Sequence, residues 1–136
     1  MQIKYPMPLT SDNRKDMFEQ VKRIIEKHCP PLVVKTDKTG VFEVMGNIAV
    51  PYGSKKTIVP GMYFASVVER KDKVSFYFFP IYFHTDEFKK LAPTVMKCLK
   101  GKTCFHFTKP GHVVEKELAD MVKKGVFAWK KEGYLK

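Results

Sequence analysis

The segment KVSFYFF at residues 73–79 carries the most structural information in this sequence. Its aromatic and β-branched residues favour an extended strand. Successive side chains of a strand point to opposite faces, so Phe76 and Phe78 share one face while Tyr77 and Phe79 share the other. A strand that is apolar on both faces is usually central in its sheet and covered on each side. We therefore expect a central strand here, with a second aromatic face that needs its own cover.

Further strand patterns surround this segment. Residues Met62–Arg70 are rich in Val, Tyr and Phe, and the polar link Lys71-Asp72 joins them to residues 73–79 as a predicted β-hairpin. The remaining predicted strands are Val41–Met45, Ile48–Val50 and Thr103–Phe107. The segment Pro51–Lys56 has the composition of a loop.

Helical periodicity marks both ends of the chain. Residues 11–28 place apolar side chains three and four positions apart, with Ser11 or Asp12 as the cap and Pro30-Pro31 as the stop. The apolar positions of this helix are Met17, Phe18, Val21, Ile24 and Ile25. Residues Val113–Lys131 form the last predicted helix, apolar on one side and lysine-rich on the other. Between them we expect a short helix at 86–91 and a second one that runs from Pro93 through Leu99.

The order of these elements predicts an α+β fold. It consists of a mostly antiparallel, curved sheet of about five or six strands, packed on one face by the first and last helices. A length of 136 residues corresponds to one domain, residues 1–136.

Charge and cysteine content limit the class of protein. The chain has 25 basic and 14 acidic residues, a net charge of +11, and only Arg14, Arg23 and Arg70 among its basic residues are arginines. Lysine is a hydrated point charge, whereas arginine provides the planar fork that reads phosphates and bases, so a specific nucleic-acid site is not expected. A weak polyanion or RNA interaction through the lysine-rich C-terminal region stays open as an alternative.

The expected location is the cytoplasm. Three cysteines without a paired spacing suggest free thiols rather than a disulfide framework. The first ten residues contain no continuous apolar run, so we do not expect a signal peptide, and no run approaches the roughly 20 residues of a membrane span.

Cys104 and His106 are candidate metal ligands. They lie two positions apart on a predicted strand and therefore share a face, where His84 or His112 could join them. No paired carboxylates or nucleophile–base pattern singles out a catalytic site, and a binding role is favoured over an enzymatic one.

Three segments give the chain a resemblance to a known family. They are Tyr63-Phe64-Ala65-Ser66, then Phe76-Tyr77-Phe78-Phe79-Pro80, and then Gly101-Lys102-Thr103-Cys104-Phe105-His106-Phe107. In this order, between an N-terminal and a C-terminal helix, they resemble the YdhG-like family of small bacterial domains, mostly of unknown function. Some relatives are labelled frataxin-like iron chaperones, so the resemblance implies iron as a cargo; otherwise no cofactor is expected. The acidic residues of this chain are scattered among its cations, whereas iron prefers carboxylate-rich sites.

The second aromatic face is the predicted ligand site. Tyr63, Tyr77, Phe79 and Tyr82 should gather on it, and tyrosine is enriched where a ring is buried while its hydroxyl stays hydrated or bonded. This face would line a small-ligand site or a homodimer contact. The alternative is a second small core, sealed by the helices expected at residues 85–99.

Overall fold

The computed structural model describes residues 9–136, so most of the N-terminal segment discussed above lies outside the described residues. The helices are α1 (Ser11–Glu26), α2 (Thr85–Leu91), α3 (Pro93–Met96) and α4 (Glu115–Lys131), with the 3-10 turns η1 (Phe79–Tyr82) and η2 (Pro110–His112). The strands are β1 (Val33–Lys38), β2 (Val41–Met45), β3 (Val50–Tyr52), β4 (Thr57–Val59), β5 (Tyr63–Glu69), β6 (Val74–Phe78), β7 (Leu99–Lys100) and β8 (Cys104–Phe107).

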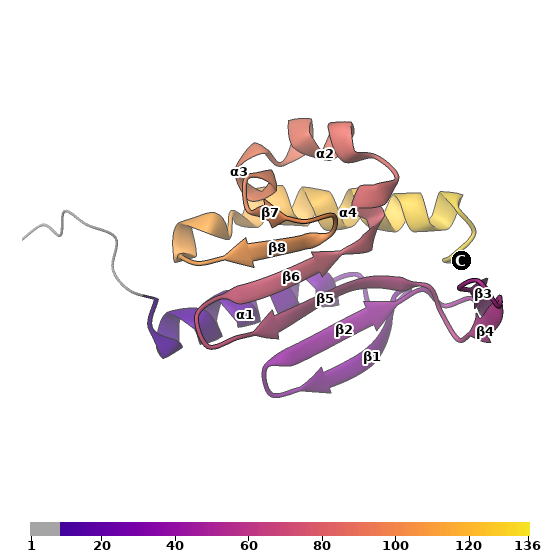
Figure 1. The fold of residues 1–136 in the computed structure, drawn as a ribbon, viewed down its shortest axis with the longest axis horizontal. Helices are drawn as coiled ribbons and strands as arrows, with labels where there is room; N and C mark the ends of the chain where they lie inside the picture. Colours follow the sequence, from indigo (N-terminus) through magenta and orange to yellow (C-terminus); the bar gives the residue numbers. More distant parts are fainter. Residues whose placement is uncertain (1–8) are drawn as a thin grey trace, which may run out of the picture.

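The strands confirm the predicted α+β class. Six of them form one curved antiparallel sheet in the order β1-β2-β5-β6-β8-β7, and β3 and β4 form a separate hairpin (Figure 1). Strand β6, which holds most of the KVSFYFF segment, lies inside the sheet with β5 on one side and β8 on the other. The hairpin expected from Met62 to Phe79 is the β5–β6 pair.

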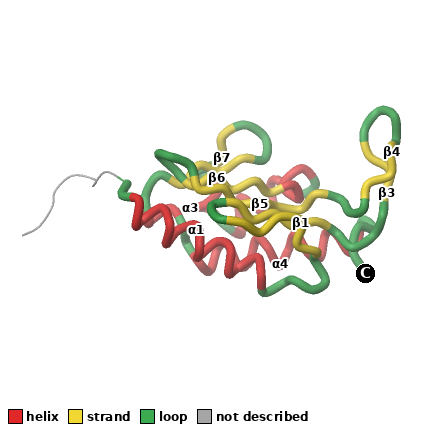
Figure 2. Tube along the Cα trace, turned by 90° about the horizontal axis from the view of Figure 1, so that it is seen from below, coloured by secondary structure: helices red, strands yellow, loops and turns green. Residues whose placement is uncertain are grey.

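Helices α1 and α4 pack on the same face of this sheet (Figure 2). All five apolar positions predicted for the first helix are buried against the strands. Helix α4 contributes the fully buried ring of Trp129, whose indole N–H donates to the carbonyl of Met62 at 3.4 Å. The hydrophobic core therefore lies between the sheet and these two helices, where the apolar helix faces exclude water.

Strand register assigns each side chain to a face. Residues directly opposite each other share a face, which places one continuous apolar row on the helix side. This row consists of Phe42, Val67, Phe76 and Phe105, all completely buried. The neighbouring row points away from the helices and consists of Glu43, Ser66, Tyr77 and Cys104.

A register shift in the β2–β5 pair turns the start of β5 around. Val44 pairs with Ala65, but the next residue, Met45, pairs with Tyr63, so Phe64 is an extra residue in the ladder. Such a bulge lets Phe64 and Ala65 both enter the core, where both are fully buried. Tyr63 consequently lies opposite Met45 on the face without helices.

Phe79 does not occupy the strand position expected from alternation. Strand β6 ends at Phe78, and Pro80 lies in the first turn of η1, because proline cannot donate a ladder hydrogen bond. The Phe79 ring therefore lies at the end of the sheet, with its centroid 5.8 Å from that of Tyr63 and 6.1 Å from that of Trp129.

Several predicted boundaries are wrong by a few residues. Thr10, rather than Ser11 or Asp12, caps α1, because its extended backbone lets Oγ1 accept the N–H of Asn13 at 3.0 Å. The segment expected to be a loop at 51–56 contains part of β3 and the turn that leads to β4, and Ile48 lies before β3.

The helix expected from Pro93 through Leu99 ends at Met96. Residues Leu99 and Lys100 instead form the short edge strand β7, which pairs with β8. The short helix expected at 86–91 corresponds to α2, and the strand expected at 103–107 corresponds to β8.

Residues 85–99 do not seal the second face of the sheet. Helices α2 and α3 pack against α4, and the Phe88 ring lies 5.3 Å from Phe78 in the main core. The alternative of a second core under these helices is therefore wrong. None of the helices within residues 9–136 is long and apolar enough to cross a membrane.

Candidate functional site: the open face of the sheet

The side of the sheet away from α1 and α4 carries the row Glu43, Ser66, Tyr77 and Cys104, and we call it the open face. Figure 2 shows α1 and α4 on one side of the sheet and the β3–β4 hairpin rising on the other side, at one end of the sheet. The strands therefore form the floor of the open face, and the β3–β4 hairpin forms a wall at one end of it.

Side chains on this floor are held in place by hydrogen bonds. The Tyr63 hydroxyl lies 2.6 Å from Oγ of Ser66. The Arg70 guanidinium donates to the Tyr77 hydroxyl at 2.8 Å and to Oγ of Ser75 at 3.4 Å. Both serines are almost completely buried beneath these larger side chains. These hydrogen bonds fix the orientation of the side chains, which lowers the entropic cost of binding.

Three of the predicted aromatic residues form a continuous row of rings. The centroid of Phe79 lies 5.8 Å from that of Tyr63 and 5.2 Å from that of Tyr82. Tyr82 is half exposed at the outer end of the row. Tyr77 lies on the neighbouring strand, where Arg70 holds its hydroxyl. The structure thus brings Tyr63, Phe79 and Tyr82 together and leaves Tyr77 beside them on the floor.

A pocket of about 360 Å³ lies where the hairpin meets the open face. Its apolar lining comes from Met45 and Tyr63 on the floor and from Tyr52, Val59 and Pro60 on the hairpin side. This volume lies within the range of small-molecule sites, which are mostly apolar with a few polar groups.

Lys35 and Glu43 supply the charged groups of the pocket. Their Nζ and Oε2 atoms form an ion pair at 3.5 Å across β1 and β2. Lys35 is the more exposed partner. Burial raises the pKa of the Tyr63 hydroxyl far above its ordinary value, and the nearby carboxylate of Glu43 acts in the same direction. Tyr63 therefore stays protonated and can serve as a neutral hydrogen-bonding group.

Sequence reasoning found one wall of this pocket and missed the others. Among the four predicted ligand residues only Tyr63 lines it. Tyr52 was missed because the segment Pro51–Lys56 has the composition of a loop, although Pro51 and Tyr52 belong to β3. Val59 lies in β4, which is none of the strands predicted above. The signal that could have found them is the short β-branched run Thr57-Ile58-Val59 across the turn.

The two candidate metal ligands also lie on the open face. Cys104 pairs with Tyr77 and His106 pairs with Ser75, so both side chains point the same way, as predicted. Burial lowers the pKa of His106, and the ammonium groups of Lys73 and Lys100 add to the effect. Residues 9–136 contain no cluster of three or more His, Cys, Asp or Glu side chains around them. A metal site at Cys104 and His106 stays a prediction.

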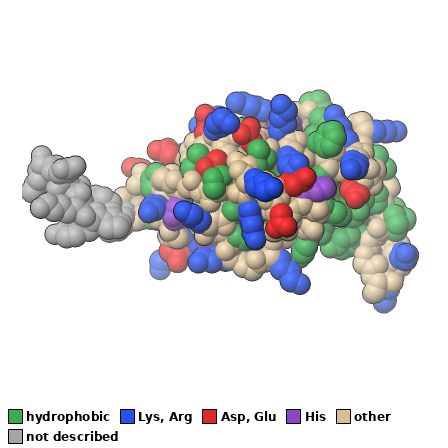
Figure 3. All heavy atoms as spheres, turned by 90° about the horizontal axis from the view of Figure 1, so that it is seen from above, with side chains coloured by type: hydrophobic (Ala, Val, Ile, Leu, Met, Phe, Trp, Pro, Cys, Tyr) green, Lys and Arg blue, Asp and Glu red, His purple; other side chains and the backbone are tan. Residues whose placement is uncertain are grey.

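The basic charge is distributed over the face of the molecule that Figure 3 draws. Figure 3 shows Lys and Arg side chains across the whole view, with carboxylates between them. On α4, Lys116 pairs with Asp120 at 3.1 Å and Lys124 pairs with Glu87 at 3.1 Å. A polyanion interaction through this helix stays a prediction as well.

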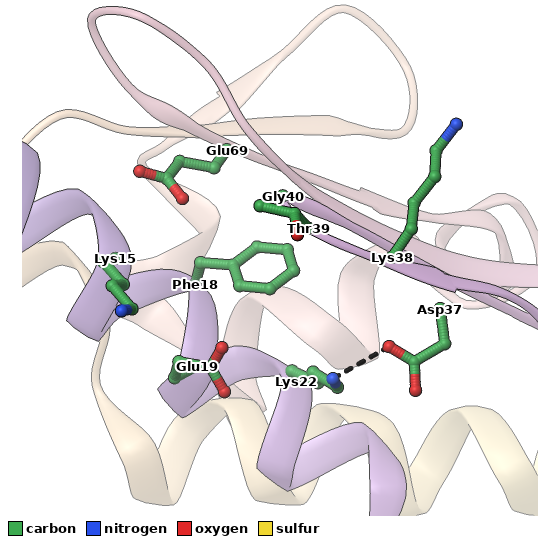
Figure 4. A pocket seen from close by; sticks show the side chains of 9 residues that line it. All are labelled: Lys15, Phe18, Glu19, Lys22, Asp37, Lys38, Thr39, Gly40 and Glu69. Atoms are coloured by element: carbon green, nitrogen blue, oxygen red, sulfur yellow. Dashed lines mark hydrogen bonds and ion pairs between the residues drawn. The ribbon is translucent and has the colours of Figure 1, made fainter.

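A further pocket, of about 450 Å³, lies between α1 and the turn that joins β1 to β2 (Figure 4). Phe18 forms its floor, and Lys22 forms an ion pair with Asp37 at 2.9 Å on one side. Glu19 and Glu69 also line it, so ammonium groups and carboxylates are mixed. This mixture favours neither sign of ligand charge.

Comparison with protein family models, with curated proteins and with solved structures finds no match to this chain.

Proposed function

We propose that this protein is a non-enzymatic binding protein whose open face holds a small molecule in the pocket under the β3–β4 hairpin. The observation that carries the proposal is an apolar pocket with one ion pair, whose lining residues all come from strands and the hairpin and none from a helix. The ligand class that fits is a ring compound with one charged group. The ring would pack on Met45, Tyr52 and Tyr63. The charged group would replace one partner of the Lys35–Glu43 ion pair and bind the other.

The exposure of apolar side chains around the pocket favours a binding role for this face. Of the apolar residues that line the pocket, Tyr52 is half exposed, and Met45, Val59 and Tyr63 are half-buried. Large exposed apolar side chains grouped around a concavity are typical of ligand or partner sites. A second copy of the chain is the other occupant that the sequence predicts for this face, and the experiment below distinguishes the two.

Methionine methyl NMR tests the proposal. Met45 lines the pocket, whereas Met121 is completely buried in the core and serves as the internal reference. We expect phenylpropionate or phenethylamine to shift the Met45 methyl signal and leave Met121 unchanged. The charge of the probe that shifts the Met45 signal tells which partner of the ion pair binds it. A Met45 signal that stays fixed with both probes contradicts the proposal.

Two variants of the hairpin provide a matched comparison. Tyr52→Ala removes a pocket wall, and Ile58→Ala removes an exposed side chain of the same hairpin that does not line the pocket. We expect at least about tenfold weaker binding for Tyr52→Ala and little change for Ile58→Ala. Equal losses contradict the pocket. If the solution mass is twice 15.8 kDa and Tyr52→Ala halves it, the open face pairs two copies instead.

We also infer a relationship to the YdhG-like family and a cytoplasmic location. The family proposal is supported by the juxtaposition of the segments that carry the resemblance. Residues 65–66 pair with Phe78 and Tyr77, and residues 76–77 pair with Phe105 and Cys104 in the next strand. The location is supported by three cysteines that form no disulfide, as is usual for a reducing compartment.

A further inference from the structure

A third pocket, separate from the one under the hairpin and from the one beside α1, lies at the β7 edge of the sheet. Its volume is about 600 Å³, and it is lined by residues from the end of α3, from strands β7 and β8, and from η2. Its charged and hydrogen-bonding side chains are Lys97, Lys100, His106, Thr108, Lys109 and His112. It shares no lining residue with the hairpin pocket.

The charge of this pocket is uniformly positive. Three lysines line it and no carboxylate does. None of the ion pairs within residues 9–136 involves Lys97, Lys100 or Lys109. The carboxylate of Glu117, on the adjacent α4, is occupied elsewhere, because it accepts the backbone N–H groups of Thr94 and Val95 at 2.9 Å each. Among the described residues, the three ammonium groups therefore have no carboxylate partner at ion-pair distance.

Two further groups add directional hydrogen bonds. Nδ1 of His112 accepts the backbone N–H of Thr108 at 3.1 Å. This bond places the ring proton of the neutral imidazole on Nε2, which is then a donor. The hydroxyl of Thr108 lies 3.5 Å from the same ring and can also donate. Neutral donors beside several ammonium groups are the pattern that recognises an oxyanion.

We propose that this pocket binds a small molecule that carries a phosphate or diphosphate group. A monocarboxylate would balance only one of the three lysines, whereas a diphosphate carries enough charge and enough acceptor oxygens for all three and for His112. A volume of about 600 Å³ also leaves room for an organic part attached to the phosphate.

Histidine NMR at constant ionic strength provides the first test. The chain has four histidines, and only His106 and His112 line this pocket. We expect pyrophosphate to shift the ring signals of these two and to leave His28 and His84 in place. The same titration with inorganic phosphate and with glucose 6-phosphate shows whether the pocket prefers the free anion or an organic phosphate. Glucose is the uncharged reference. No shift up to roughly 10 mM of any phosphate overturns the proposal.

Charge-matched variants provide the second test. The variant K97Q/K100Q/K109Q removes three lysines from the pocket, and K55Q/K89Q/K90Q removes three exposed lysines from the hairpin turn and α2. We expect at least about tenfold weaker pyrophosphate binding for the first variant and less than about threefold for the second. Circular dichroism confirms that both are folded.

Equal losses in the two variants overturn the proposal, because they indicate attraction to net charge alone. A second outcome also overturns the proposal: the protein binds a single-stranded RNA, both variants weaken that binding equally, and pyrophosphate does not compete with it. This result would indicate an extended surface for polyanions. Neither result affects the hairpin pocket, since the two pockets share no residue.

Discussion

The guanidinium of Arg70 donates a hydrogen bond to the hydroxyl of Tyr77 at 2.8 Å, across the turn that joins β5 to β6. The same group reaches Oγ of Ser75, which is 1% exposed. One of only three arginines in the chain is thus used to hold the floor of the open face. Strand register places Tyr77 on the floor, and this contact holds its hydroxyl there.

The Arg70–Tyr77 contact should be measurable as a coupling energy. We expect Arg70→Ala to lower the free energy of unfolding by about 1–2 kcal/mol, because Ser75 loses a partner in a buried position. The double-mutant cycle with Tyr77→Phe should give a coupling of about 0.5–1 kcal/mol in urea titrations. Additive effects of the two substitutions would show that the hydrogen bond contributes nothing to stability.

Phe76 should be one of the most costly residues to truncate. Its ring is completely buried between Phe78 and Phe107, both stacked on it at 5.5 and 6.1 Å. We expect Phe76→Ala to cost about 3–5 kcal/mol in denaturant titrations. Phe127→Ala is the control, because that ring is 68% exposed and should cost below about 1 kcal/mol. A loss below about 1 kcal/mol for Phe76→Ala would contradict its central position.

Gly125 should be intolerant of a single added methyl group. A Cβ at this position of α4 would lie 2.8 Å from Cζ of Phe78 and 3.0 Å from Cζ of Phe64. Alanine normally stabilises a helix by up to about 1 kcal/mol relative to glycine. Here we expect Gly125→Ala to destabilise the protein by about 1–3 kcal/mol instead, because the rings must move. In Gly111→Ala the new methyl group meets nothing within 4 Å, so that variant should have the stability of the wild type. Thermal unfolding and urea titrations of both variants measure the difference.

The thiol of Cys29 should make stability fall at alkaline pH. Burial raises its pKa from the ordinary value of 9.0 to about 11 in the folded protein. Between these two values the unfolded chain loses the thiol proton while the folded chain keeps it, so the equilibrium shifts toward unfolding as the pH rises. This stabilisation is fully present below pH 9 and is lost by about pH 11.

Urea midpoints of the wild type and Cys29→Ala at pH 8 and pH 10 check this effect. Other groups also titrate in this range, and they do so in both proteins. We expect the stability difference between the two proteins to move in favour of Cys29→Ala at the higher pH. A difference that is independent of pH would mean that the thiol has the same pKa in the folded and unfolded states.

Local patterns in the sequence were sufficient for most of the fold. The helical spacing of Met17, Phe18, Val21, Ile24 and Ile25 marks the buried face of α1, and the alternation around Phe76 marks a central strand. Both are periodic signals that each element carries by itself, because burial on one side selects the same residue type every second or every third to fourth position. The class of the fold followed from the order of these elements.

The pockets depended on contacts that no local pattern encodes. The bulge at Phe64 turns Tyr63 onto the open face, and the β3–β4 hairpin brings Tyr52 and Val59 beside it. Lys97, Lys100 and Lys109 meet because a short edge strand and two loops converge there, although the sequence shows only scattered lysines. Composition and periodicity determined the buried faces of α1 and β6 and the order of the main elements. Tertiary structure decided which exposed side chains become neighbours, since that depends on register, bulges and loop paths rather than on the hydrophobic pattern.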